Sequence, residues 1–61
     1  MTEYPLATQI AAVKREIALR ERNYPRWVSS ARLTPERAAF ELGVMRAVLA
    51  TLSQQDRGPS E

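Results

Sequence analysis

The residues of this chain best suited to chemistry form an aromatic and basic group, Tyr24-Pro25-Arg26-Trp27. This group lies in the segment 14–32, which has six cations, two anions and a local net charge of +4, whereas the segments on either side each sum to −1. Tyr, Trp and Arg dominate the hot spots of protein interfaces, and concentrated positive charge attracts phosphate or acidic protein surfaces. These residues therefore indicate recognition by contact, and the candidate partner-binding residues are Arg20, Arg22, Tyr24, Arg26, Trp27 and Arg32.

Three of these candidate binding residues, Tyr24, Trp27 and Arg20, also have a purely structural interpretation. Tyr24 and Trp27 are spaced to plug the closed end of a helical hairpin, unless one ring, more readily Trp27, stays exposed as an anchor for a partner. Arg20 occupies a slot in the apolar pattern. It either extends outward beside Glu16 or a partner chain, or binds a carboxylate or phosphate at a cleft. The sequence leaves these alternatives open.

Catalysis is poorly supported by the residue types present. The chain has no Cys and no His, and its carboxylates are scattered without a pair at acid–base or metal-binding spacing. It also lacks a glycine-rich phosphate loop. We therefore expect a protein that is not an enzyme and that uses no metal and no cofactor.

Two stretches of apolar residues, at alternating spacings of four and three, predict the elements that position these residues. Such spacing places one apolar stripe along an α-helix. The first stripe is Leu6, Ile10, Val13, Ile17, Tyr24 and Trp27, and the second is Ala38, Leu42, Met45, Leu49 and Leu52. The pattern predicts an all-α fold, a two-helix hairpin over residues 5–54, with helices from about 5 to 23 and from 35 to about 53 or 54.

The connection between the two helices contains both internal prolines. Pro25 predicts that the first helix stops or kinks there, followed by a short, bent helical turn over 25–31. Thr34 has the side chain of an N-cap, and Pro35 suits the first helical position. Residues 1–4 are expected to be a flexible N-terminus, and residues 55–61 a disordered tail.

The second helix has more apolar surface than one facing helix can cover. Phe40, Val44, Ala47 and Val48 widen its apolar face beyond the stripe. Because a core of this size rarely supplies more than about 3–5 kcal/mol, a second copy is the remaining source of stability. We expect a homodimeric four-helix bundle in which the dimer and core residues are Leu42, Val44, Met45, Val48, Leu49 and Leu52.

Gly43 is the weak position of this second helix. Glycine in a helix interior costs about 0.5–1 kcal/mol relative to Ala. Either it lets another helix approach closely, or it is tolerated at an exposed site. No apolar run reaches the roughly 18–20 residues of a membrane span, and no signal-like N-terminus is present, so we expect a cytoplasmic protein with no membrane partner.

The stretch 15–52 resembles a group of very small proteins encoded by bacteriophages and prophages. The resemblance is carried by Arg15-Glu16-Ile17, Arg20, Tyr24-Pro25, Val28, Leu33-Thr34, Ala38, Glu41 and Met45-Arg46-Ala47-Val48-Leu49. Such helical-hairpin proteins include inhibitors of host regulators, for example anti-quorum-sensing proteins. The resemblance implies a phage-derived protein that binds and inhibits a host bacterial protein in the host cytoplasm. Its motif specifies structure, so no functional residue is carried over from it.

Two other functions remain open from the sequence. The basic segment also suits a nucleic-acid-binding accessory protein, although the connection does not fit a helix-turn-helix motif. A structural or assembly component is the third alternative. Salt dependence separates the first two functions, because phosphate contacts release counterions.

Overall fold

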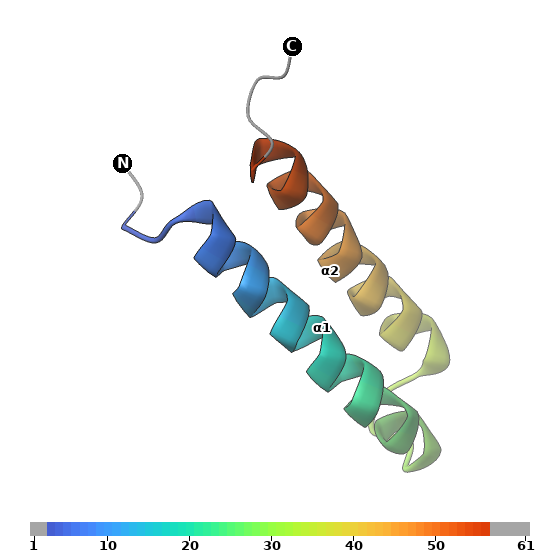
Figure 1. Cartoon of the computed structure of the whole chain (residues 1–61). Coiled ribbons are helices and arrows are strands. Elements are labelled where there is room, and N and C mark those ends of the chain that lie inside the picture. Colours follow the sequence, from blue (N-terminus) through green and yellow to red (C-terminus); the bar gives the residue numbers. More distant parts are fainter. Residues whose placement is uncertain (1–2, 57–61) are drawn as a thin grey trace.

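The fold is a two-helix hairpin, seen here in a computed structural model that describes residues 3–56. Helices α1 (Leu6–Ser29) and α2 (Pro35–Asp56) lie antiparallel and pack against each other along their length (Figure 1). The all-α hairpin expected from the sequence is confirmed. Of the two expected flexible ends, residues 1–2 and 57–61 lie outside the described residues.

A single seam between the helices holds the hairpin together. Ile17 and Tyr24 of α1 and Ala38 of α2 are its buried residues, with exposed fractions of 8–9%. The other members of both predicted stripes are half-buried, except Trp27, which is 39% exposed. The predicted stripes are therefore the inner faces of the two helices, and the core that they form is small.

An ion pair between α1 and α2 flanks this seam. Arg46 donates a hydrogen bond to the Glu21 carboxylate across 25 positions of sequence. Both side chains are about half exposed. An exposed pair of this kind contributes about 0–1 kcal/mol to the free energy of unfolding. Its main effect is therefore on the register of the two helices.

The start of α2 follows the sequence prediction. The hydroxyl oxygen of Thr34 accepts a hydrogen bond from the Arg37 backbone N–H at 3.0 Å, and Pro35 is the first helical residue. Thr34 thus satisfies one of the N–H groups that a helix start leaves without an internal partner.

The C-terminal end of α2 departs from the prediction. The helix continues through Gln55 to Asp56, so the predicted tail began two residues too early. No glycine or proline follows before Gly58, and glutamine has good helix propensity, which is why the last turn extends.

Pro25 gives the largest correction to the sequence prediction. α1 is one continuous helix from Leu6 to Ser29 with Pro25 inside it, and no separate bent turn follows residue 23. Pro25 itself is exposed, whereas Tyr24 is buried and Val28 is half-buried. Continuing the helix keeps both neighbours on the seam, and this packing outweighs the hydrogen bond that proline cannot donate to the Glu21 carbonyl.

Pro25→Ala should stabilise the hairpin by about 1–3 kcal/mol, because it restores one hydrogen bond without disturbing the seam. The matched control is Pro35→Ala, whose N–H has no internal partner at the first helical position. Denaturant unfolding followed by circular dichroism measures both variants. If Pro25→Ala changes stability no more than Pro35→Ala does, Pro25 does not strain α1.

Within residues 3–56, neither helix is long and apolar enough to cross a membrane.

Candidate functional site

The closed end of the hairpin, residues 24–34, is called the elbow here. α1 ends there in a Schellman motif: the Arg32 N–H donates to the Trp27 carbonyl at 2.9 Å, and the Ala31 N–H donates to the Val28 carbonyl at 3.1 Å. The Ser30 hydroxyl also donates to the Trp27 carbonyl, at 3.2 Å. These bonds satisfy carbonyls at the helix end and fix the backbone that follows the aromatic residues.

Ala31 occupies the left-handed position of this motif, with φ of 64°. Left-handed backbone costs an L-residue about 1–2 kcal/mol, and glycine usually fills this position. The elbow therefore keeps its shape against a local conformational preference.

Ala31→Gly should raise the free energy of unfolding by about 1 kcal/mol, because glycine adopts this φ without the Cβ penalty. The control is Ser30→Gly, since Ser30 has φ of −89° and gains nothing from glycine. Thermal unfolding of both variants gives the comparison. Equal destabilisation by the two glycines would contradict the left-handed assignment.

The two aromatic residues of the elbow have different environments. Tyr24 is buried in the seam, whereas Trp27 is 39% exposed. Their ring centroids are 5.6 Å apart at an interplanar angle of 40°, within the usual separation for aromatic pairs. Tyr24 thus has the structural role considered above, and it braces a Trp27 ring whose other side faces solvent.

The arginines of the site fall into two groups, paired and unpaired. Arg20 forms a 2.7 Å ion pair with Glu16, one turn earlier in α1. Of the two alternatives for Arg20, this is the one in which the side chain extends outward beside Glu16. This hydrogen bond raises the pKa of the Arg20 guanidinium. Arg26 donates a 3.4 Å hydrogen bond to Asn23, and within residues 3–56 neither Arg22 nor Arg32 takes part in an ion pair.

The residues predicted for the dimer and the core also divide into two groups. Leu42, Met45, Leu49 and Leu52 are half-buried on the seam. Val44 and Val48 are instead 43% and 40% exposed, and the neighbouring Phe40 is 58% exposed. These three recur at spacings of four, so one outer face of α2 carries apolar side chains that the hairpin does not cover.

Arg37 lies against one end of this outer apolar face. Its guanidinium lies 5.3 Å from the centroid of the Phe40 ring and forms a 2.7 Å ion pair with Glu41. Gly43 has open space around it, because no neighbouring atom would lie within 4 Å of an added Cβ. Within one hairpin, therefore, no second helix approaches Gly43.

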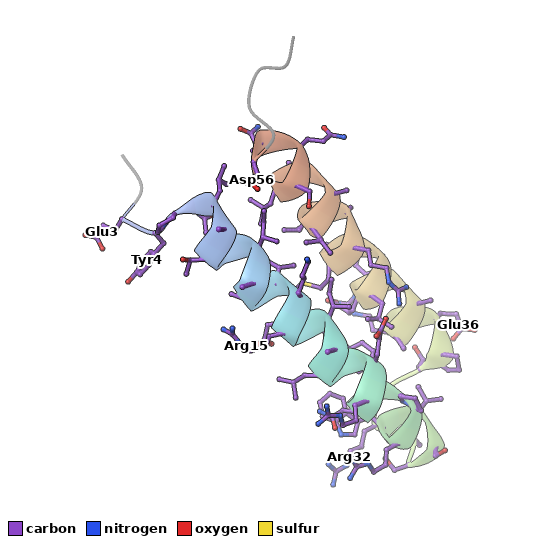
Figure 2. The ribbon with its side chains drawn as sticks, in the orientation of Figure 1. Glu3, Tyr4, Arg15, Arg32, Glu36 and Asp56 are labelled. Carbon is purple, nitrogen blue, oxygen red and sulfur yellow. The ribbon has the colours of Figure 1, made fainter. Side chains whose placement is uncertain are left out.

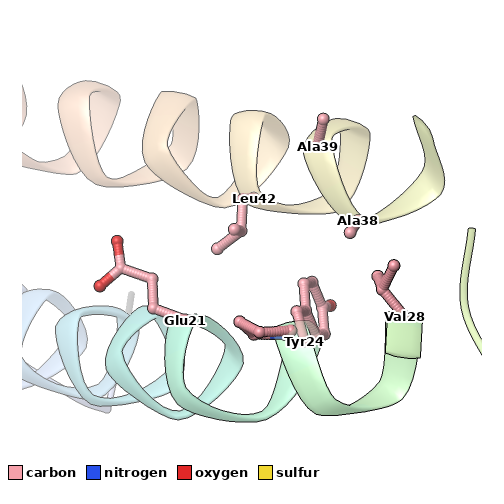
Figure 3. A pocket seen from close by; sticks show the side chains of 7 residues that line it. Glu21, Tyr24, Val28, Ala38, Ala39 and Leu42 are labelled. Carbon is pink, nitrogen blue, oxygen red and sulfur yellow. The ribbon is translucent and has the colours of Figure 1, made fainter. Parts of the chain in front are cut away.

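A groove on one flank of the elbow was not predicted from the sequence. It has a volume of about 330 Å³. Tyr24, Pro25 and Val28 line it from α1, with Ala38 and Leu42 opposite on α2 (Figure 3). Glu21 lies at one end, where Arg46 already engages it. The available sequence signal is the continuation of the apolar pattern past Pro25, although Pro25 itself predicts that the helix stops or kinks.

A smaller hollow lies beside Trp27. Its volume is about 240 Å³, and Leu19, Arg20, Asn23 and Trp27 contribute to its lining. The exposed Trp27 ring is therefore at the edge of a concave surface that contains a charged guanidinium. In the described part of the chain, no group of three or more acidic side chains is arranged to hold a metal ion.

Comparisons with protein-family models, with curated proteins and with solved structures found no match to this chain. The resemblance to small phage proteins thus stays a prediction.

Proposed function

We propose that this protein is a small, non-enzymatic interaction protein that binds another protein through its elbow. One observation carries the proposal: the Trp27 ring packs on the buried Tyr24 ring and is 39% exposed, on a helix end fixed by the Schellman motif. A rigid tryptophan beside arginines is the usual composition of a binding hot spot, because little entropy is lost on docking. Arg20 lines the hollow beside the ring, Arg26 precedes Trp27 in the chain, and Arg32 lies in the elbow.

We further propose that the binding form is a homodimer. Only three residues of the described chain are buried, and none of its side chains is fully buried. The apolar face of Phe40, Val44 and Val48 is the surface that a second hairpin would cover, giving a four-helix bundle. This arrangement leaves the elbow of each chain accessible.

Light scattering at micromolar concentration should give about twice the mass of one chain. Val44→Glu/Val48→Glu should reduce it to one chain, because four carboxylates would be placed in the dimer contact without partners. Glutamate has better helix propensity than valine, so a lower mass by light scattering would not result from a weaker helix. The control is Ala50→Glu, at an exposed position outside the apolar face; a monomeric parent chain would refute the dimer.

The resemblance to small phage proteins suggests the class of partner, which is part of the same proposal. A phage-derived protein of this kind would bind and inhibit a host bacterial protein, such as a regulator, in the host cytoplasm. An accessory protein that binds nucleic acid is the second candidate. The observation favouring it is that five cations of α1 and the elbow form no ion pair within residues 3–56: Lys14, Arg15, Arg22, Arg26 and Arg32.

Trp27→Ala and Arg26→Glu should each abolish capture of the partner from bacterial lysate, measured by affinity purification and mass spectrometry. Circular dichroism and dimer mass should stay unchanged, because neither side chain is buried. The control is Lys14→Glu, an equal charge change outside the elbow.

If Trp27→Ala unfolds the protein, the ring belongs to the core, and Arg26→Glu alone then tests the surface. Capture that survives Arg26→Glu would contradict an elbow site. Binding of duplex DNA whose affinity falls steeply with salt would instead support the second candidate, because each neutralised phosphate adds about −0.9 to the slope of log K against log salt.

A further inference from the structure

The outer side of α1 carries four residues at spacings of four, three and four: Arg15, Leu19, Arg22 and Arg26. Residues at these spacings share one helix face, so we call them the outer stripe. All four are exposed, and Leu19 is 43% exposed. Figure 2 shows Arg15 on the side of α1 that points away from α2. At 1.5 Å per residue the stripe extends about 16 Å along the helix.

The arginines of the outer stripe are separate from the ion pairs of the hairpin. The three ion pairs among residues 3–56 use Arg20, Arg37 and Arg46, and none of them includes an arginine of the outer stripe. Within the described residues, the only polar side-chain contact of the three stripe arginines is that of Arg26 with Asn23. They lie along one line on α1. Side chains at the same spacing on a second helix packed against this face would lie opposite them.

We propose that the outer stripe binds an acidic helical segment of the partner protein, with carboxylates at the same repeat opposite the arginines. This inference rests on the proposed function and names the partner's chemistry. Arginine suits the role because its planar fork can hold a carboxylate through two hydrogen bonds. Arg26 belongs to both the stripe and the elbow, so the two surfaces are continuous and one partner can engage Trp27 as well.

Leu19 is the residue that favours a protein over a nucleic acid. It stands between Arg15 and Arg22 in the stripe, where a phosphate backbone offers its apolar surface no favourable contact. A helix with an apolar residue at the matching position covers Leu19 while its carboxylates meet the arginines. Electrostatic complementarity with one central apolar contact is typical of specific protein interfaces.

The test uses designed probes. The first probe is an alanine-based helical peptide with three glutamates and one leucine at the stripe's spacing, and the second has the same composition with the glutamates spread around the helix. A 20-base-pair DNA duplex at the same salt concentration is the third. Fluorescence anisotropy measures the affinity of the full chain for each, and we expect the patterned peptide to bind tightest.

Two variants and a matched control locate the contact. Arg22→Glu should weaken binding of the patterned peptide about fivefold to tenfold, since it replaces one ion pair with a repulsion. Leu19→Ala should weaken the peptide complex about threefold or more and leave DNA binding unchanged. Lys14→Glu, an equal charge change one position outside the stripe, should have a smaller effect than Arg22→Glu.

Equal binding of the two peptides, no binding of the patterned peptide at millimolar concentration, or tighter binding of DNA would each overturn the inference. So would an effect of Lys14→Glu as large as that of Arg22→Glu. If Trp27-dependent capture from lysate persists in Leu19→Ala/Arg22→Glu, the stripe is not used and the proposed function stands. If the stripe binds the peptide but Trp27→Ala folds and leaves capture intact, the elbow proposal fails alone.

Discussion

The seam between α1 and α2 is the interaction on which the rest of the structure depends. Two helices in contact can cover only one side of each other, and here the covered sides bury three residues well: Ile17, Tyr24 and Ala38. Both outer faces are left to solvent, and their compositions differ. The outer face of α2 exposes Phe40, Val44 and Val48, and that of α1 carries arginines that form no ion pair within residues 3–56, so the same constraint produces two surfaces with different chemistry.

The elbow shows how this seam overrides local preferences. α1 runs through Pro25 because Tyr24 and Val28 on either side of it pack against α2. Six residues after Pro25, Ala31 adopts a left-handed backbone so that the chain can reverse within a few residues. Two unfavourable local conformations are thus held by packing, and they place the Trp27 ring at the hairpin's closed end.

Sequence periodicity was enough to predict the hairpin, both apolar stripes and the Thr34 cap, since each depends on neighbours within one or two turns. It failed at Pro25, where a local rule competes with contacts to a helix more than ten positions away. The groove and the Glu21–Arg46 pair were not foreseeable for a related reason: both join residues distant in sequence. Spacing put Arg20 within reach of Glu16, but only the geometry shows that the pair forms.

In the proposed dimer, the two outer faces would make different contacts. A dimer built through Phe40, Val44 and Val48 of α2 would bury the apolar faces at its centre and leave both copies of α1 on the outside. The arginines of the outer stripe would then be presented twice, on opposite sides of the bundle. A partner that is itself dimeric and spans both sides would bind with the benefit of effective concentration, without any new contact. The α2 face would set the number of binding surfaces, and the α1 face and the elbow would set their specificity.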